Sequence, residues 1–596
     1  FLGLFTTDPA DRTALTDLVL QYFPQQVDFI ATQIDDVQRV RVGLGIAGSI
    51  VIVWTALGVF RAISSAVNHA WNVETRRSFL KHQASAFLML VAAGAMMLVA
   101  LLVGALTLGV EAPDGVGEAP PAVARTAMSL AGEASDLWFC IGPTAVLDGI
   151  RDRSVQVASI AAGPVDGRVI VVDERGRVVE RAFRLDAGDR LEIRPGRFVP
   201  GSAFAAVTVE VPGGAVVVGQ RVEGDGVDQR PCLTRTSGTW LVPWSTTARP
   251  GNRVWLLLHN PFPASAVVDL RFVGDIGRRE TLDSQGMVVA GRSMVAYDVT
   301  ERISDSSVVS ALVRVRVGQV GVARLQLANG DGPSGIRGLD LAPGLPEARS
   351  RLFVSGVGPV AGSTDGSGGD LSVVVLNPGE ETIELEVVAR TSPSDGFVEP
   401  WPVVLRAGQR HVVDLGDGRL DGVGTFSIEV RTLDDQPVAA SLVRRGAVTS
   451  DRQTGGGDQA TDDQPVGDRV DVPDLDVPDL AVRPLTAVAA RGWLVDLGER
   501  FESSGDILAV ANPSGSSIAT IEVKVLAGRA PEGLPAVVEL GPGAQVVFPL
   551  GAGGPVILAV ESTSGVVASV RESSPSGSTA GVAVAVAGTE EWPESG

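Results

Sequence analysis

Three parts of this chain repeat the same landmarks at the same spacing. In each part an apolar stretch ends in the dipeptide Asn-Pro, and a glycine follows 30 residues after that proline. The pairs are Pro261 and Gly291, Pro378 and Gly408, and Pro513 and Gly543. A polar turn and a stretch of alternating apolar and polar residues lie between them. Such a repeat predicts several homologous units rather than one continuous core.

An earlier stretch carries the same order with different residues. It opens with LWFCIG at Leu137, has Gly163-Pro164 in place of Asn-Pro, and reaches Gly188 after 24 residues. We therefore expect four units, each with roughly six or seven short strands of period-two alternation, which is typical of an immunoglobulin-like β-sandwich. The fold class is then mainly β, with tandem sandwich repeats over residues 136–236, 237–346, 347–449 and 489–575.

The repeated Asn-Pro has two interpretations. Proline lacks a backbone N–H and fixes φ, so it ends a hydrogen-bonded ladder, and an Asn side chain caps turns well. Asn260, Asn377 and Asn512 would then be structural residues of a sandwich turn. The alternative is a loop, shared by the units, that contacts a ligand. We expect the turn.

The start of the chain has a different character. Residues 42–60 are 19 residues without a charge, and residues 83–110 form a second uncharged run. A helix of about 20 apolar residues spans the hydrocarbon core of a bilayer, so two transmembrane helices are expected, with two buried core helices as the alternative. The pattern GLGIAG at 43–48 matches a dinucleotide motif, but inside an apolar span it favours close helix packing.

Charges predict the orientation of these spans. The segment between them, 61–85, carries four basic residues against the single acid Glu74, whereas both flanks are acidic. The positive-inside rule places this loop in the cytoplasm and puts residues 1–41 and everything after 110 outside. Residues 1–41 show helical apolar periodicity and are expected to form amphipathic helices. Because the chain begins at Phe1, we expect a fragment or a processed product.

Two resemblances accompany these patterns. FLGLF, the apolar span and AISSAVNHAWNVETRRSFLKHQ (62–83) resemble the YihY/virulence factor BrkB family of inner-membrane proteins over residues 1–110. That resemblance implies a plasma-membrane location and a transporter or flippase-type activity. The WFC-x-G opening at 138–142 and the Asn-Pro strands are similar to an exported actinobacterial family of unknown function over about 136–575. That resemblance implies a fold and an exported location, but no activity.

The segments around the units are polar. Residues 111–135 and the acidic, Gly- and Pro-rich residues 450–488 are expected to be linkers, the second of them disordered. Residues 576–596 are expected to be a tail with one alternating apolar stretch.

The two cysteines, Cys140 and Cys232, lie 92 residues apart in the part predicted to be outside. An oxidising compartment permits a disulfide, which would contribute on the order of 4–5 kcal/mol on the chain-entropy model. Two separate buried thiols are the alternative. We expect the disulfide.

Composition excludes several functions. A net charge of −21 argues against nucleic acid as a partner. Four histidines and two cysteines are too few for a Cys/His zinc cluster, and the common metalloprotease, serine-hydrolase and P-loop motifs are absent from the sequence. No cofactor, metal site or catalytic residue is expected, although counting carboxylates leaves a glycosidase-like pair open.

These observations predict a membrane-anchored, extracytoplasmic β-sandwich protein of the bacterial plasma membrane. Its expected role is binding or scaffolding of an envelope protein or glycan without catalysis, with the lipid bilayer as its other partner. One alternative is a partial BrkB-like transporter or flippase that carries an external domain. An extracytoplasmic hydrolase is a third and weaker alternative, because no motif supports it.

Overall fold

The structure is a computed structural model of the 596-residue chain. It describes residues 136–596, except for 332–335, 359–369, 392–395, 446–479, 487–488, 499–505, 575–576, 581, 587–589 and 592–596. The chain divides into two compact units, Phe1–Ala124 and Arg125–Gly596. The predicted spans 42–60 and 83–110, the loop 61–85, the amphipathic helices of 1–41 and the linker 111–135 lie outside the described residues.

Within the described part of the chain, no helix combines the length and the apolar character needed to cross a membrane.

The described residues form β-sandwiches. The first contains β1 (Leu137–Pro143), β2 (Ile150–Ser159), β3 (Val165–Asp173), β4 (Val178–Leu185), β5 (Arg190–Ile193), the short helix α5 (Pro195–Phe198), β6 (Phe204–Glu210), β7 (Val216–Gly224) and β8 (Val227–Pro231). The second contains β9 (Thr239–Val242), β10 (Asn252–Asn260), β11 (Ala266–Gly274), β12 (Gly277–Arg279), the 3-10 helix η4 (Leu282–Ser284), β13 (Met287–Val289), β14 (Ser293–Asp298), β15 (Ser310–Val317), β16 (Gly321–Asn329) and β17 (Arg337–Pro343).

Two further sandwiches follow. The third contains β18 (Arg351–Val357), β19 (Asp370–Leu376), β20 (Ile383–Arg390), β21 (Trp401–Leu405), β22 (Arg410–Asp414), β23 (Phe426–Thr432), β24 (Ala439–Arg445) and β25 (Leu480–Pro484). The fourth contains β26 (Ala489–Leu497), β27 (Ile507–Ala511), β28 (Ala519–Ala527), β29 (Val537–Leu540), β30 (Gln545–Pro549), β31 (Val556–Ser574), β32 (Gly577–Ala580), β33 (Val582–Ala585) and β34 (Glu590–Glu591).

All four sandwiches share one strand order. In the first, the sheets are β1-β6-β3-β4 and β5-β2-β7-β8, and the third repeats this order with β18-β23-β20-β21 and β22-β19-β24-β25. The second has the same order with β13 added beside β11. In the fourth, the long strand β31 serves both sheets: its first part pairs with β26 and β28, and its second part pairs with β27.

The mainly β class and the antiparallel sheets are confirmed. The strand order differs from that of an immunoglobulin constant domain, in which the first, second, fifth and fourth strands share a sheet. Here the first strand joins the sixth and third strands, and the second sheet gains an eighth strand at its edge. Period-two alternation predicts where strands lie in the sequence, but it does not determine which strands pair with each other in a sheet.

Two stretches differ from their predicted roles. Leu480–Pro484, within the expected linker 450–488, forms β25 and pairs with β24, so the third sandwich takes its eighth strand from beyond residue 479. In the expected tail, β32, β33 and β34 are strands, and β33 pairs with β26. Leu480–Pro484 is only five residues long, and the Gly-, Pro- and Asp-rich sequence before it conceals its alternation, whereas β33 is the alternating stretch expected in the tail.

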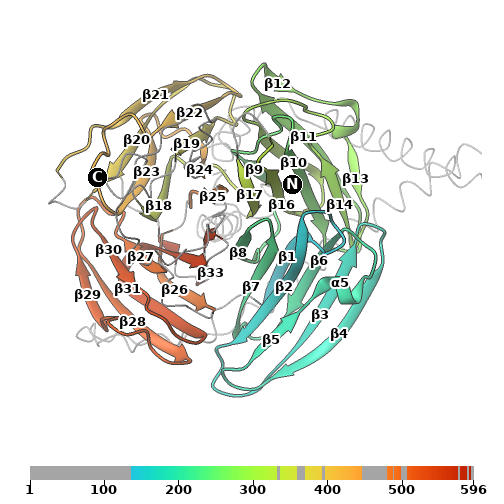
Figure 1. Cartoon of the computed structure of the whole chain (residues 1–596), viewed down its shortest axis with the longest axis horizontal. Coiled ribbons are helices and arrows are strands. Elements are labelled where there is room, and N and C mark those ends of the chain that lie inside the picture. The colour runs from blue at the N-terminus through green and yellow to red at the C-terminus, as the bar shows by residue number, and fades with distance from the viewer. Residues whose placement is uncertain are drawn as a thin grey trace, which may run out of the picture. The chain divides into compact units, whose positions relative to one another are not determined.

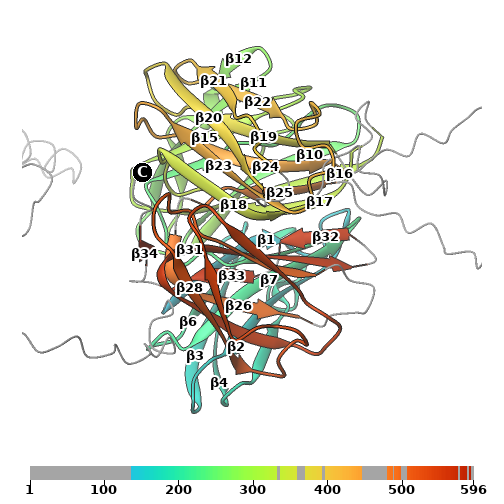
Figure 2. The same ribbon diagram turned by 90° about the vertical axis from the view of Figure 1, so that its left-hand side faces the viewer.

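The sandwiches form a closed ring, because apolar clusters join each one to the next and the fourth to the first (Figures 1 and 2). Representative members are Ile141, Phe204, Trp255 and Leu341 between the first and second; Trp244, Ala328, Val374 and Val443 between the second and third; Phe353, Ala489 and Val567 between the third and fourth; and Ala158, Val217, Leu494 and Ile557 between the fourth and first.

The ring explains why the strands before Asn-Pro are continuously apolar. In β10, Leu256 and Leu258 point into the core of the second sandwich, while Leu257 packs against the first sandwich. Likewise, Val373 and Val375 of β19 lie in the core of the third sandwich, and Val374 faces the second. A strand buried on both faces needs apolar residues at every position, so the run before Asn-Pro is the sequence signal of an inter-sandwich contact.

The Asn of each Asn-Pro clamps two turns together. Asn377 is buried; its Nδ2 donates to the backbone oxygens of Glu381 and Leu405, at 2.7 and 3.2 Å, and its Oδ1 accepts from the N–H of Gly379 at 2.9 Å. Asn260 and Asn512 make the equivalent contacts. These bonds join the turn after the second strand to the turn before the fifth, and they account for the repeated dipeptide without a ligand.

Removal of one clamp should destabilise its sandwich. Asn377→Ala leaves the buried carbonyl group of Leu405 and the half-buried bonding groups of Gly379 and Glu381 without their partner, so we expect the free energy of unfolding to fall by roughly 1–3 kcal/mol. Asn329, whose exposed side chain bonds to Asp331, provides the matched control, and Asn329→Ala should change stability by no more than about 0.5 kcal/mol. Denaturant titration of both variants measures this. Equal stabilities would show that the clamp is dispensable.

Candidate functional site

The eighth strands meet at the centre of the ring. β8 contacts β17, β17 contacts β25, β25 contacts β32, and β32 contacts β8. In the first three sandwiches each of these strands ends at a proline: Pro231, Pro343 and Pro484. Proline cannot donate to a further ladder, so it ends the strand at this edge. Two residues later the chain turns back to bridge the first strand of the same sandwich, at Leu233, Leu345 and Thr486.

A buried polar network joins three sandwiches at this centre. The carboxylate of Asp340 (β17) accepts from Arg230 Nη2 of β8 at 2.9 Å, from the N–H of Val482 of β25 at 2.9 Å, and from Arg324 Nη2 of its own sandwich. Arg230 Nη2 also donates to the carbonyl oxygen of Val482 at 2.6 Å. Asp228 of β8 accepts from Arg230 and from the N–H of Leu341 at 2.6 Å.

The charges in this network compensate one another. Burial acts to lower the pKa of Arg230, but the charges of Asp228 and Asp340 outweigh it, so the pKa of this guanidinium is raised. Arg230, Asp228 and Asp340 are each less than 7% exposed. A buried charge is tolerated only when it is paired and hydrogen-bonded, as it is here.

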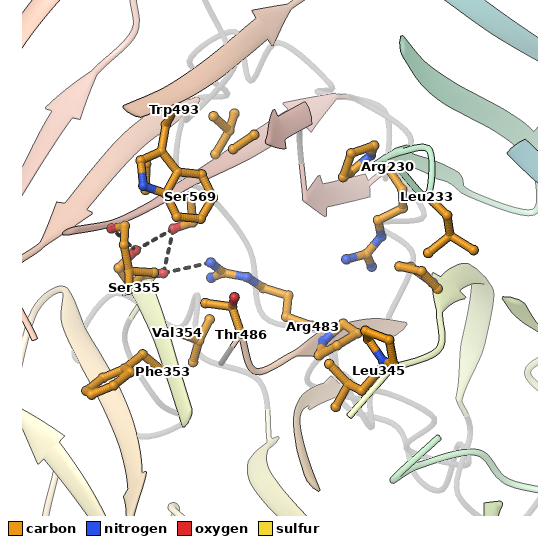
Figure 3. A pocket seen from close by; sticks show the side chains of 18 of the residues that line it. Arg230, Leu233, Leu345, Phe353, Val354, Ser355, Arg483, Thr486, Trp493 and Ser569 are labelled. Carbon is orange, nitrogen blue, oxygen red and sulfur yellow. Dashed lines mark hydrogen bonds between the residues drawn. The ribbon is translucent and has the colours of Figure 1, made fainter. Parts of the chain in front are cut away.

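A cavity of about 310 Å³ lies beside this network, and all four sandwiches line it. This volume is near the lower end of the range for small-molecule sites. Figure 3 shows side chains from the four sandwiches converging on it. Most of its wall is apolar; the lining includes Leu233, Leu345, Phe353, Val354, Trp493, Val570 and the prolines that end the eighth strands.

One wall of the cavity is polar. Ser355 of β18 and Ser569 of β31 face each other with their Oγ atoms 2.7 Å apart, and Ser569 Oγ also lies 2.9 Å from the carbonyl oxygen of Ser355. Arg483 of β25 donates to the carbonyl oxygens of Ser355 at 2.7 Å and Gly356 at 3.3 Å (Figure 3). Gly356 has φ of 64°, a conformation that favours glycine and turns its carbonyl toward the guanidinium.

A disulfide between the two cysteines fixes the chain segment next to the cavity. The structure joins Cys140 of β1 and Cys232, which follows β8, in a disulfide. The predicted pair therefore ties the first strand of the first sandwich to the segment Pro231–Leu233 at the cavity wall. Both cysteines are buried in the core of the first sandwich.

The two histidines among the described residues, His259 and His411, lie in different sandwiches. His259 is buried between the first two sandwiches, with Nε2 3.3 Å from Thr208 Oγ1 and Nδ1 3.2 Å from the carbonyl oxygen of Ser293. His411 is exposed on the third sandwich, and His69 and His82 lie outside the described residues. The described residues contain no group of three His, Cys, Asp or Glu side chains arranged to hold a metal ion.

Sequence reasoning missed the central network and the polar wall. A usable signal was present: Arg-Pro recurs at 230–231 and 483–484, each time followed by a residue that turns back to the first strand. An arginine directly before the proline that ends a short strand indicates a charge held at a sheet edge. The partner Asp340 is 110 residues from Arg230, so its role required the three-dimensional structure.

The Asp340 network should be worth several kcal/mol to the ring. Asp340→Asn removes the charge that compensates Arg230 and Arg324, and breaking a buried ion pair typically costs about 3–5 kcal/mol. Asp166→Asn is the matched control because Asp166 pairs with Arg184 in an exposed position, where the expected change is about 0–1 kcal/mol. Denaturant titration compares the two; equal losses would contradict the role of the network.

His259 should make stability depend on pH. Burial lowers its pKa from 6.5 to about 4, with only the contact to Ser293 opposing it. The unfolded chain therefore binds a proton that the folded protein excludes, and stability present above about pH 6.5 is lost as pH falls toward about 4, by up to roughly 3 kcal/mol. His259→Gln should flatten this part of the profile. Unfolding of both proteins at several pH values tests it, and parallel profiles would contradict it.

Comparisons with known proteins match the chain in two segments. Residues 1–135 match the family model of virulence factor BrkB, an inner-membrane family. Residues 210–463 match the model of a family of unknown function, DUF5719. Both segments were expected from the resemblances. No curated protein matches the chain. Among solved structures, the crystal structure of a tetra-tandem repeat in the extending region of a large adhesion protein is similar at 10% identity, covering 78% of this chain and all of that one, with a TM-score of 0.09.

Proposed function

We propose that this chain is a membrane-anchored protein of the bacterial plasma membrane whose sandwich ring lies on the extracytoplasmic side and binds or scaffolds an envelope component. A protein or a glycan of the envelope is the proposed partner, and no catalysis is involved. The observation that carries this proposal is the junction of a BrkB-type segment with a disulfide-linked β-sandwich ring that encloses a central cavity. A disulfide is expected in extracytoplasmic compartments and is rare in the cytosol.

The closed ring favours binding over catalysis. The cavity wall presents arginines, serines and apolar side chains, and among the described residues that line it no histidine stands next to the serines as a general base. A serine without an adjacent base is a poor nucleophile. A pocket with a few convergent polar groups on an apolar wall suits the recognition of a ligand.

A second candidate function rests on the other segment. The match of residues 1–135 to virulence factor BrkB supports a transporter or flippase-type protein that carries the ring as an external domain. In that case the ring would present or capture the transported molecule. Both candidates require the ring to be outside the plasma membrane, so one topology measurement tests them together.

The topology is best measured with introduced cysteines, because Cys140 and Cys232 are buried and bonded to each other. Ser265→Cys adds a thiol at an exposed turn of the second sandwich, and Ser78→Cys adds one in the segment 61–85 expected in the cytoplasm. In intact cells a membrane-impermeant maleimide should label the first variant, whereas the second should be labelled only after permeabilisation. The reverse pattern would put the ring inside and overturn the proposed function.

A further inference from the structure

Four charged side chains line the central cavity: Arg230, Arg235, Glu347 and Arg483. The first three form ion pairs within the described residues. Arg230 pairs with Asp228 and Asp340, and Arg235 pairs with Glu347 at 3.1 Å. Arg483 differs: within the described part of the chain, its side-chain partners are the two carbonyl oxygens of Ser355 and Gly356. As far as the described residues extend, the positive charge of Arg483 on the polar wall is therefore not paired with a carboxylate.

A second guanidinium, that of Arg571, lies next to the polar wall but is not itself among the residues that line the cavity. Arg571 belongs to β31, two residues after Ser569, and residues two apart in a strand point to the same face. A Cβ placed on Gly358 would lie 2.6 Å from Arg571 Nη1, so this guanidinium lies against the end of the segment whose carbonyl groups bind Arg483. Among the described residues no hydrogen-bond partner reaches the buried Nε of Arg571.

The electrostatics of this wall agree with its geometry. Burial, and after it neighbouring positive charges, lower the pKa of Arg483 to about 9; those charges belong to Arg230, Arg571 and Arg444. Burial also lowers the pKa of Arg571, with Asp506 opposing it. Partly buried like charges repel one another and are stabilised by a bound anion. In a chain of net charge −21, such a concentration of arginines at an interior wall is a local feature, not an effect of composition.

We propose that Arg483 and Arg571, together with the hydroxyl groups of Ser355 and Ser569, bind the carboxylate or phosphate group of a small ligand whose apolar part occupies the central cavity. Arginine presents several N–H donors in a planar fork that matches both anions, and serine hydroxyls add donors. Leu233 and Leu345, which lie across the cavity from Ser355 and Ser569, receive the apolar part together with the rest of the apolar lining (Figure 3). This inference names a ligand class for the proposed binding role and rests on it.

The test uses the full chain in nanodiscs of zwitterionic lipid, with calorimetry as the measurement of affinity and intrinsic tryptophan fluorescence, to which Trp493 in the cavity wall contributes, as a second readout. The probes are phenyl phosphate, benzoate and inorganic phosphate, with benzyl alcohol as the neutral counterpart. We expect at least one aromatic anion to bind more tightly than both benzyl alcohol and inorganic phosphate. The tighter of phenyl phosphate and benzoate identifies the acidic group.

Variants assign the binding to the arginines. Arg571→Gln should weaken the aromatic anion roughly tenfold or more, because a hydrogen bond to a charged group is lost, while benzyl alcohol should be unaffected. Arg571→Lys keeps the charge, guards against a folding defect and should lose less. Arg184→Gln removes an exposed arginine that pairs with Asp166 and should leave binding unchanged.

The inference is overturned if the wild-type chain binds neither anion more tightly than benzyl alcohol, or if Arg571→Gln and Arg184→Gln behave alike. Those results leave the cysteine-labelling pattern untouched. Conversely, an inverted labelling pattern would overturn the proposed function but would leave the measured anion affinity unchanged. Failure of the proposed function and failure of the anion-binding inference are therefore distinguishable.

Discussion

The carboxylate of Asp340 joins groups from three sandwiches within a few ångströms: the guanidinium of Arg230, that of Arg324, and the backbone N–H of Val482. Apolar contacts between sheets are tolerant of sliding, because their energy depends on the area buried rather than on direction. A buried ion pair is directional and costly to break, so it selects one arrangement among many that bury similar area. The order of the ring depends on this contact, because it holds β8, β17 and β25 at one point.

The remaining architecture follows from the need to bury both faces of the second sheet in each sandwich. Leu256, Leu257 and Leu258 alternate between the core of their own sandwich and the neighbouring one. An isolated sandwich would expose the face that carries Leu257. Each sandwich therefore requires a neighbour, and closure of the ring gives every one of them two. The Asn-Pro turn ends these two-sided strands and, through Asn260, Asn377 and Asn512, anchors the turn to the rest of its own sandwich.

Much of this was accessible from the sequence. The repeat spacing and alternation predict a mainly β chain of homologous units, and the Asn-Pro landmark predicts a structural turn. The unbroken run of apolar residues before Asn260 indicates a strand buried on both faces, because a strand of a free sandwich would alternate between apolar and polar residues. The strand order was beyond sequence reasoning, because the pairing of the first strand with the sixth depends on contacts 61–73 residues apart, as between Trp138 and Val209. The role of Leu480–Pro484 was hidden for a related reason: the acidic insertion separates it from its partner β24.

The polar wall was predictable from the sequence in one respect and not in another. Arg230 and Arg483 stand at equivalent positions before the proline that ends an eighth strand, so the repeat predicts that they share an environment. The structure shows where they diverge. Arg230 meets Asp228 and Asp340, whereas Arg483 meets carbonyl oxygens within the described residues and is close enough to Arg571 to feel its charge. In a ring built from repeated units, one copy of the arginine is used to hold the sandwiches together. The other copy, at the cavity, is not needed for that purpose, and such divergence between equivalent positions is how a structural repeat acquires a binding site.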